Sequence, residues 1–378
     1  MEYNLWDLDR VNIKLNTSFL NKVNKIILAK FKTKRIFHDK FFSSKIPFST
    51  FRDLLKLSHS KKYFVPLEIY IKIANALEIN LEELQTNIIS YKTANGSNSI
   101  ESPSLPIIIT PVFHMLFAHN IGDGTVINSK KGRLPYFGYR QFNEFYRLSY
   151  VKRAEFVFGK IKYYDNYTIK STRVYLPAVI SSLFFKFYDL KVEDFLSERA
   201  RLPNQILNAD KDSKLAVIIG FIIDEGYIDS TQITIGLKNH LLVKDLQAIC
   251  LDLGYKTTLT NGKGEYVDYS YLHILREGMK KLYLDYSDIN KRYPVIDLGI
   301  KGERIRASFE IYTRKIMRTV GNQEVIFDVL SNECLSVNQL ALRINMTRQG
   351  IRYHIHKLLN ENKIRIIDKN QLNWIYGI

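Results

Sequence analysis

The sequence predicts an α+β protein in three parts: an all-helical N-terminal part, a middle part with two α-β-β-α repeats, and a C-terminal part of helices followed by a hairpin. Three observations predict this class. A polar, turn-rich stretch at 92–106 separates helix-like apolar spacing from the rest of the chain. Beyond it, two apolar helices each end on an acid followed by glycine, and past residue 320 short amphipathic helices precede two strand-like runs. We therefore expect domains at 1–91, 107–319 and 320–378, with 92–106 as a linker.

Composition restricts the partner and the setting. The 378 residues hold 55 Lys and Arg against 38 Asp and Glu, a net charge of +17, which indicates a polyanionic partner because basic side chains release the counterions condensed on phosphates. Cys250 and Cys334 lack the spacing of zinc or disulfide frameworks, so we expect an intracellular location, cytoplasmic or nucleoid-associated. Apolar runs such as 215–223 are shorter than the roughly 20 residues that span a bilayer, so we expect no membrane partner.

The N-terminal part has four runs with helix-like apolar spacing: 19–31, a shorter run around Phe41, 49–57 and 66–77. They predict a small all-helical bundle. The stretch 65–84 resembles the closing helices of the phage-repressor (Cro/C1-type) helix-turn-helix family, and 48–56 falls where that family has its recognition helix. The resemblance implies DNA contacts in a major groove from Ser49, Thr50 and Arg52. The alternative is a plain helical bundle used for contacts between proteins.

The middle part contains an internal repeat. Residues 116–124 align with 218–226, and each of these pieces is an apolar helix that ends on an acid and then glycine. Each is followed by β-rich runs and then by a further helix: 125–128, 136–141 and 143–158 in the first copy, 227–237 and 239–253 in the second. The alignment pairs Asp123 with Glu225.

Small residues recur at a spacing of four on the two apolar helices. They share one face of each helix and let two backbones approach closely: Ala118 and Gly122 in the first, Ala216 and Gly220 in the second. Packed side by side, such helices bring Asp123 and Glu225 together at their C-terminal ends, where the helix dipole disfavours a carboxylate. A bound divalent cation would relieve this repulsion, and hard oxygen ligands suit Mg²⁺. A lone Asp-Gly is more often an ordinary turn, so the interpretation depends on both copies.

This double pattern resembles the LAGLIDADG homing endonuclease family, over residues 107 to about 290. The resemblance implies a pseudo-symmetric αββαββα core in which the two helices form the interface between the halves. It implies a β-saddle that lies along the major groove of double-stranded DNA. It also implies that Asp123 and Glu225 are the catalytic pair and hold two divalent ions, expected to be Mg²⁺.

Family members also have a basic or amide residue at the end of a saddle strand near the active site. The resemblance assigns this place to Lys238 in the second half and to Gln141, with Arg140 beside it, in the first. Lys238 and Gln141 would orient water or stabilise charge on the phosphorane. His119 and Asn120 depart from the family's apolar pattern, and their buried polar atoms would need partners.

The C-terminal part predicts two short amphipathic helices at 322–342 and a third at 346–358, after a threonine cap. Strand-like runs at 363–367 and 372–376, joined by a turn, predict a β-wing. The segment resembles a winged helix-turn-helix domain, which implies phosphate and base-edge contacts from its third helix: Arg348, Gln349, Arg352 and His356. The alternative is a dimerisation winged helix with a solvated basic face.

We expect an Mg²⁺-dependent endonuclease, and the resemblance to homing endonucleases implies that it cuts both strands of double-stranded DNA at a long site. Because one chain carries both repeats, we expect a monomer. The alternative from another class is a transcription regulator that keeps the fold for reading DNA and has lost cleavage. The sporulation-regulator family WhiA resembles such a fusion. A second alternative is an RNA maturase on the same fold, which would recognise RNA by shape and unpaired bases.

Overall fold

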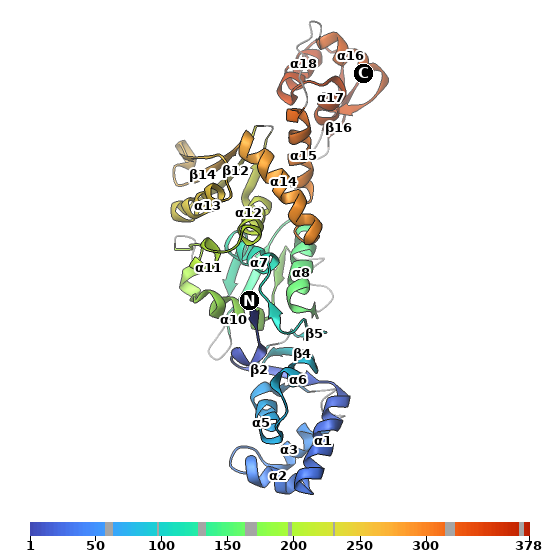
Figure 1. Cartoon of the computed structure of the whole chain (residues 1–378). Coiled ribbons are helices and arrows are strands. Elements are labelled where there is room, and N and C mark those ends of the chain that lie inside the picture. Colours follow the sequence, from blue (N-terminus) through green and yellow to red (C-terminus); the bar gives the residue numbers. More distant parts are fainter. Residues whose placement is uncertain are drawn as a thin grey trace.

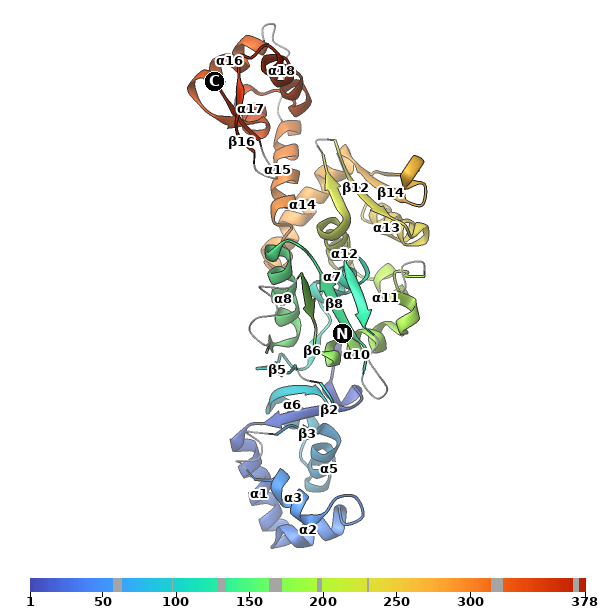
Figure 2. The same cartoon turned by 180° about the vertical axis from the view of Figure 1, so that it is seen from behind.

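The computed structural model describes residues 1–56, 63–96, 98–127, 134–162, 172–195, 199–229, 231–313, 322–369 and 374–378. Figure 1 shows an elongated molecule, with N-terminal helices at one end, two sheets and their helices in the middle, and a small C-terminal unit at the other end. The view from behind gives the same order (Figure 2). Helices and strands both contribute, so the predicted mixed class is confirmed.

The N-terminal part has helices where the apolar spacing predicts them: α1 (Thr17–Phe31), α2 (Lys34–Phe41), α3 (Phe48–Leu54) and α5 (Leu67–Leu77), followed by α6 (Leu81–Thr86). The predicted run at 49–57 extends beyond the described residues at its last position. Phe37, Phe42 and Phe51 are fully buried, with ring centroids 5.2 to 5.9 Å apart. These rings join α2 and α3 in one core.

The prediction of an all-helical N-terminal part is wrong. Four of its segments are strands: β1 (Glu2–Tyr3), β2 (Val11–Leu15), β3 (Val65–Pro66) and β4 (Ile88–Thr93). In β2 the buried Val11, Ile13 and Leu15 alternate with the partly exposed Asn12 and Lys14, the period of two that a half-buried strand requires. β2 pairs antiparallel with both β3 and β4.

The stretch predicted as a linker, 92–106, is instead built into this sheet. Its strand β5 (Ile100–Glu101) pairs with β4 and with β9 (Lys160–Ile161) of the middle part, in the order β3-β2-β4-β5-β9. Ile100 is fully buried, so one apolar side chain anchors an otherwise polar stretch. β1 (Glu2–Tyr3) pairs with β6 (Ile107–Ile108), which places the N-terminus at the middle part (Figure 1).

The middle part has two halves with a related order of elements. The first half contains α7 (Pro111–Ile121), β7 (Gly124–Ile127), β8 (Tyr136–Arg140), α8 (Glu144–Phe158), β10 (Arg173–Tyr175) and α10 (Ala178–Tyr188). After the short α11 (Asn204–Leu207), the second contains α12 (Lys211–Glu225), β11 (Gly226–Ile228), β12 (Gln232–Leu237), α13 (His240–Asp252), β13 (Thr257–Asn261), β14 (Ser270–Leu275) and α14 (Arg276–Arg292).

The sheets of the two halves are antiparallel and differ in size. Their strand orders are β10-β8-β7 and β11-β12-β14-β13. The second half therefore has the predicted αββαββα order. Within the described residues, the sheet of the first half has three strands, because β9 pairs with β5 of the N-terminal sheet.

The two apolar helices, α7 and α12, lie side by side at the centre of the molecule (Figures 1 and 2). Every residue from Val112 to Asn120 and from Ser213 to Ile223 is buried, as expected for helices covered on all sides. A methyl group at Gly220 would lie 3.0 Å from Cβ of Ala118. The small residues therefore allow the close approach of these two helices.

The C-terminal part contains α16 (Asn322–Asn332), β15 (Leu335–Ser336), α17 (Val337–Ile344), α18 (Arg348–Asn360), β16 (Arg365–Lys369) and β17 (Trp374–Gly377), with sheet order β15-β17-β16. It has a hydrophobic core of its own around Ile326, Leu340 and Ile351. The preceding helix α15 (Ile300–Thr313) leads to it from the middle part (Figure 1). Among the described residues, no helix combines the length and apolarity needed to cross a membrane.

Candidate functional site

The two acids of the repeat lie where α7 and α12 end and the first strand of each half begins. α7 ends at Ile121, two residues before Asp123, whereas α12 continues to Glu225 itself. A glycine follows each acid because the new strand passes close to the last helical turn. A Cβ at Gly124 would lie 2.1 Å from the Asn120 carbonyl oxygen, and a Cβ at Gly226 would lie 2.5 Å from that of Ile222.

Asp123 is partly buried and is held in place by the neighbouring strand. Gln141 Nε2 donates a hydrogen bond of 2.8 Å to its Oδ2, and the Arg140 amide donates one of 3.0 Å to its carbonyl oxygen. Burial raises the pKa of the Asp123 carboxyl to about 8, with further increases from the negative charges of Asp224 and Glu225. Gln141, which the resemblance assigns to the neighbourhood of the acids, is therefore hydrogen-bonded to Asp123.

Glu225 lies in the same electronegative region. Burial raises the pKa of its carboxyl, and the charge of Asp224 raises it further, while Lys301 acts in the opposite direction. A site in which two carboxyls hold protons above their ordinary range is one where a cation would be bound in their place.

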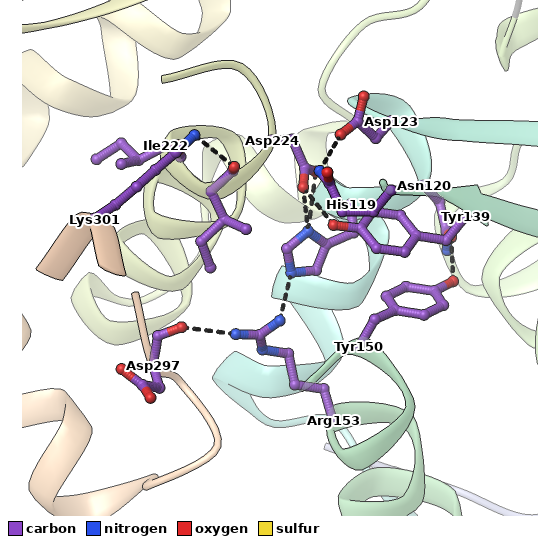
Figure 3. A network of polar contacts seen from close by, with 12 residues as sticks. His119, Asn120, Asp123, Tyr139, Tyr150, Arg153, Ile222, Asp224, Asp297 and Lys301 are labelled. Atoms are coloured by element: carbon purple, nitrogen blue, oxygen red, sulfur yellow. Dashed lines mark hydrogen bonds and ion pairs between the residues drawn. The ribbon is translucent and has the colours of Figure 1, made fainter. Parts of the chain in front are cut away.

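Asp224 is a third acid at this junction, outside the pair that the repeat predicts. Its side chain is fully buried, and its carboxylate reaches across to the first half. Oδ2 lies 2.9 Å from His119 Nδ1, and Oδ1 accepts a hydrogen bond of 2.7 Å from the Tyr139 hydroxyl (Figure 3). His119, which departs from the apolar pattern, thus finds its partner in the other half of the chain.

A buried arginine determines the tautomer of His119. Arg153 NH1 lies 3.2 Å from His119 Nε2, and because a guanidinium only donates, Nε2 accepts and the ring proton is on Nδ1. Burial lowers the pKa of His119, which keeps the imidazole neutral. The neutral imidazole therefore donates its Nδ1 proton to Asp224. Arg153 also donates to the carbonyl oxygens of Val295 and Asp297, at 2.9 and 2.8 Å.

Asn120, the second polar residue of α7, is only half satisfied. Its Oδ1 accepts a hydrogen bond of 2.6 Å from Tyr150, whose ring stacks on Tyr139 with centroids 4.3 Å apart. Its buried Nδ2 has no hydrogen-bond partner among the described residues. Asn120 thus belongs to the same polar layer as His119 and Asp224 (Figure 3).

Lys301, which lies in α15 and outside both repeats, brings a positive charge to all three acids. Its Nζ donates to the carbonyl oxygen of Ile222 at 2.8 Å (Figure 3). It also donates to that of Ile223 at 2.6 Å, in the last turn of α12. Burial lowers the pKa of Lys301, and the three neighbouring carboxylates oppose that change. A lysine that caps a helix C-terminus offsets the negative end of the helix dipole.

Lys238 follows directly after β12, the strand that pairs with β11. It is exposed, and its Nζ lies 5.6 Å from the ring centroid of Tyr269. Its predicted equivalence to Gln141 is wrong by one residue. Gly124 opposes Tyr139 and Gly226 opposes Ile235, so the position equivalent to Lys238 is Phe142. The charge of Lys301 lowers the pKa of Glu225.

The residues predicted to contact DNA from the flanking parts are mostly exposed. Ser49, Thr50 and Arg52 are exposed on α3, and Gln349, Arg352 and His356 are exposed on α18. Arg348 is an exception, at 7% exposed. It shares the helical face of Ile351 and Ile355, which pack into the C-terminal core, so this face is not available to a groove.

A divalent metal fits the donor set at the helix ends. Among the described residues, no three His, Cys, Asp or Glu side chains are grouped so that they alone could hold a metal. Mg²⁺ characteristically keeps several waters and binds through one or two carboxylates together with substrate phosphates. The paired, partly buried carboxylates of Asp123 and Glu225 match that requirement.

Two antiparallel sheets joined by a central helix pair, with acids at the helix ends, describe the class of architecture found here. Solved structures with a similar arrangement include mesophilic variants of the homing endonuclease I-DmoI, with a TM-score of 0.35 at 17% identity over 47% of this chain and 96% of that chain. For the homing endonuclease I-WcaI bound to its DNA recognition sequence, the TM-score is 0.31 at 13% identity, over 48% of this chain and 82% of that chain. For full-length DUF199/WhiA from Thermatoga maritima, the TM-score is 0.28 at 10% identity, over 66% of this chain and 90% of that chain.

I-DmoI has also been solved in complex with DNA and Mn and in complex with DNA and Ca. No protein-family model and no curated protein matches the chain.

Proposed function

We propose that this protein is a DNA-binding, divalent-metal-dependent nuclease that cleaves both strands of double-stranded DNA at a specific site. The observation that carries the proposal is the cluster of acids at the ends of α7 and α12. Asp123 and Glu225 come from equivalent places in the two repeats, and burial together with nearby negative charge raises the pKa of both. Their placement is unfavourable for the protein alone and favourable for a bound cation.

Asp123 and Glu225 would hold the metal, expected to be Mg²⁺, at the junction between the halves. When bound, the ion would supply positive charge to the scissile phosphate and to the attacking water. Gln141 fixes the orientation of the Asp123 carboxylate through its hydrogen bond. Lys301 fixes the last turn of α12 and lowers the net charge of the three acids.

The outer faces of the two sheets would contact the DNA. In the first half, Arg140 and Arg173 are direct neighbours on β8 and β10, which places two cations side by side. In the second half, Thr234 and His273 are direct neighbours on β12 and β14 and are hydrogen-bonded to each other. His273 is also hydrogen-bonded to Thr260 on β13. Cations suit phosphates and the hydroxyl and imidazole groups suit base edges, in keeping with the net charge of +17.

A transcription regulator without cleavage is the second candidate, and the flanking parts favour it. Exposed polar and basic residues lie on α3 and α18, at the two ends of the elongated molecule (Figure 1). Two further DNA-reading units would extend a site that the sheets already cover. The two candidates differ in what the acids do, so cleavage separates them.

The test is cleavage of a supercoiled plasmid library of candidate sites, with and without Mg²⁺. We compare the wild type with the double variant Asp123→Asn, Glu225→Gln and with Glu265→Gln, which neutralises an exposed acid far from the junction in sequence. Linear product that requires Mg²⁺, is formed by the wild type and Glu265→Gln, and is missing for the double variant would support the nuclease. If no protein cuts any plasmid and all three shift DNA equally in a gel, the regulator replaces the nuclease.

A further inference from the structure

The two halves have different residues directly before their acids. Gly122 precedes Asp123, and Asp224 precedes Glu225, at positions that the repeat aligns with each other. The two residues meet across the helix pair, since a Cβ at Gly122 would lie 2.9 Å from Asp224 Oδ2 and 3.3 Å from Asp224 Cβ. The Asp224 side chain thus fills the space that the missing side chain of Gly122 leaves.

Asp224 is therefore next to both acids of the site. It is bonded directly to Glu225 in the chain, and in space it packs on the residue that precedes Asp123. The Asp224 side chain is therefore in contact with one half and covalently linked to the acid of the other.

Two buried groups from the first half hold this carboxylate, and a third holds one of them. His119 and Tyr139 donate to it, at 2.9 and 2.7 Å, and Arg153 holds the imidazole from behind at 3.2 Å. Arg153 is in turn fixed by the carbonyl oxygens of Val295 and Asp297, so the chain of contacts continues to the segment between α14 and α15. Both carboxylate oxygens already accept hydrogen bonds inside the protein, which leaves Asp224 poorly placed to serve as a metal ligand (Figure 3).

We propose that Asp224 is a positioning residue: held by His119 and Tyr139, it fixes the spacing of Asp123 and Glu225 across the two halves and does not itself bind the metal. The inference rests on the proposed function, because it concerns the same metal site. Groups that orient metal ligands from behind characteristically change metal affinity by about 10- to 100-fold when they are removed. The contact crosses from one half to the other, so its loss affects both acids.

The test measures binding of Mn²⁺ alone to the full-length protein, with free Mn²⁺ followed by EPR. His119→Leu keeps all three carboxylates and removes the donor, so we expect Mn²⁺ affinity to fall about tenfold or more. His119→Asn presents an amide donor near the place of Nδ1 and should restore most of that affinity. Tyr139→Phe removes only a hydroxyl and should give a smaller loss. It tests the same contact even where His119→Leu does not fold.

The matched control is His114→Leu, on the same helix. His114 is also buried, and its Nδ1 lies 2.8 Å from the Tyr188 hydroxyl, away from the acids. We expect this variant to bind Mn²⁺ as the wild type does. Unchanged Mn²⁺ affinity in folded His119→Leu and Tyr139→Phe would overturn the positioning role and leave the metal site intact. Absence of Mn²⁺ binding by the wild type would instead refute the metal site, and the positioning role with it.

Discussion

Replacement of Asp123 by Asn should make the metal-free protein less sensitive to rising pH. In the folded chain, burial and neighbouring acids raise the pKa of Asp123 from 3.8 to about 8. The folded state therefore keeps a proton that the unfolded chain has already released, and stability falls as pH rises from the unfolded pKa toward the folded one. Above pH 8 both states are ionised and the contribution becomes constant. Glu225 has a raised pKa and acts with the same sign.

The magnitude follows from the size of the shift. Between pH 5 and pH 8 the linkage amounts to roughly 3.5 kcal/mol for a carboxyl with these two pKa values. Asp123 is only partly buried, and solvent screening reduces the effect to about 2 kcal/mol. The wild type should lose about this much more stability than Asp123→Asn between pH 5 and pH 8. Addition of Mg²⁺ at about 10 mM should restore stability at pH 8 in the wild type only, because a ligand that binds the folded state stabilises it.

The assay is urea unfolding at pH values from 5 to 8.5 without divalent ions, followed by tryptophan fluorescence and circular dichroism. Glu265→Gln is the control, since it removes one exposed negative charge outside the junction. The comparison between variants cancels the titration of groups that the charge of Asp123 does not reach. If Asp123→Asn and the wild type lose stability in parallel across this range, the acid does not occupy the strained position inferred here.

Three further predictions concern the helix interface, the lysine and the DNA surface. Gly220→Ala should destabilise the protein by about 1 kcal/mol, since crowding against Ala118 costs about 1–3 kcal/mol and helix propensity returns about 1; adding Ala118→Gly should recover stability in thermal melts. Lys301→Met should lower the melting temperature, because two hydrogen bonds to carbonyl oxygens are lost, each contributing about 1.5 kcal/mol or more. Thermal melts followed by circular dichroism at neutral pH test this, and coincident melts of variant and wild type would contradict it. Arg140→Ala should weaken DNA binding in gel shifts and reduce its salt dependence by about one ion, whereas Arg306→Ala, on α15, should leave both unchanged.

Long helices, the repeat and the strands after its helices could be predicted from sequence, whereas the short strands of the N-terminal sheet could not. The apolar spacing in α1, α5 and α18 extends over several turns, which makes the helical period recognisable. β2 has five residues and β5 has two, too few to establish an alternation against the surrounding helical spacing. The polar stretch at 92–106 has the composition of a linker, and its place in the sheet depends on the strand β9 far along the chain.

The candidate site was predictable where the repeat identifies equivalent positions. Asp123 and Glu225 follow from the alignment of two helices that end in the same way. Lys301 lies in neither copy, so only the folded chain brings it to the last turn of α12. The ends of β8 and β12 make Lys238 and Gln141 look equivalent, whereas the register of the strand ladder differs by one residue.

Asp224 had a signal in the sequence that a search for identical positions overlooks. Within the two aligned motifs, the small Gly122 corresponds to a charged residue, and the structure shows that the two fit each other. Two identical halves could not form this contact. Two aspartates would place like charges in one buried space, and two glycines would leave that space empty. A single chain that carries both copies can differ at this position, and the contact between His119 of α7 and Asp224 of α12 depends on that difference. The asymmetry therefore explains why the first motif accepts a polar residue at a helix interface that is otherwise apolar.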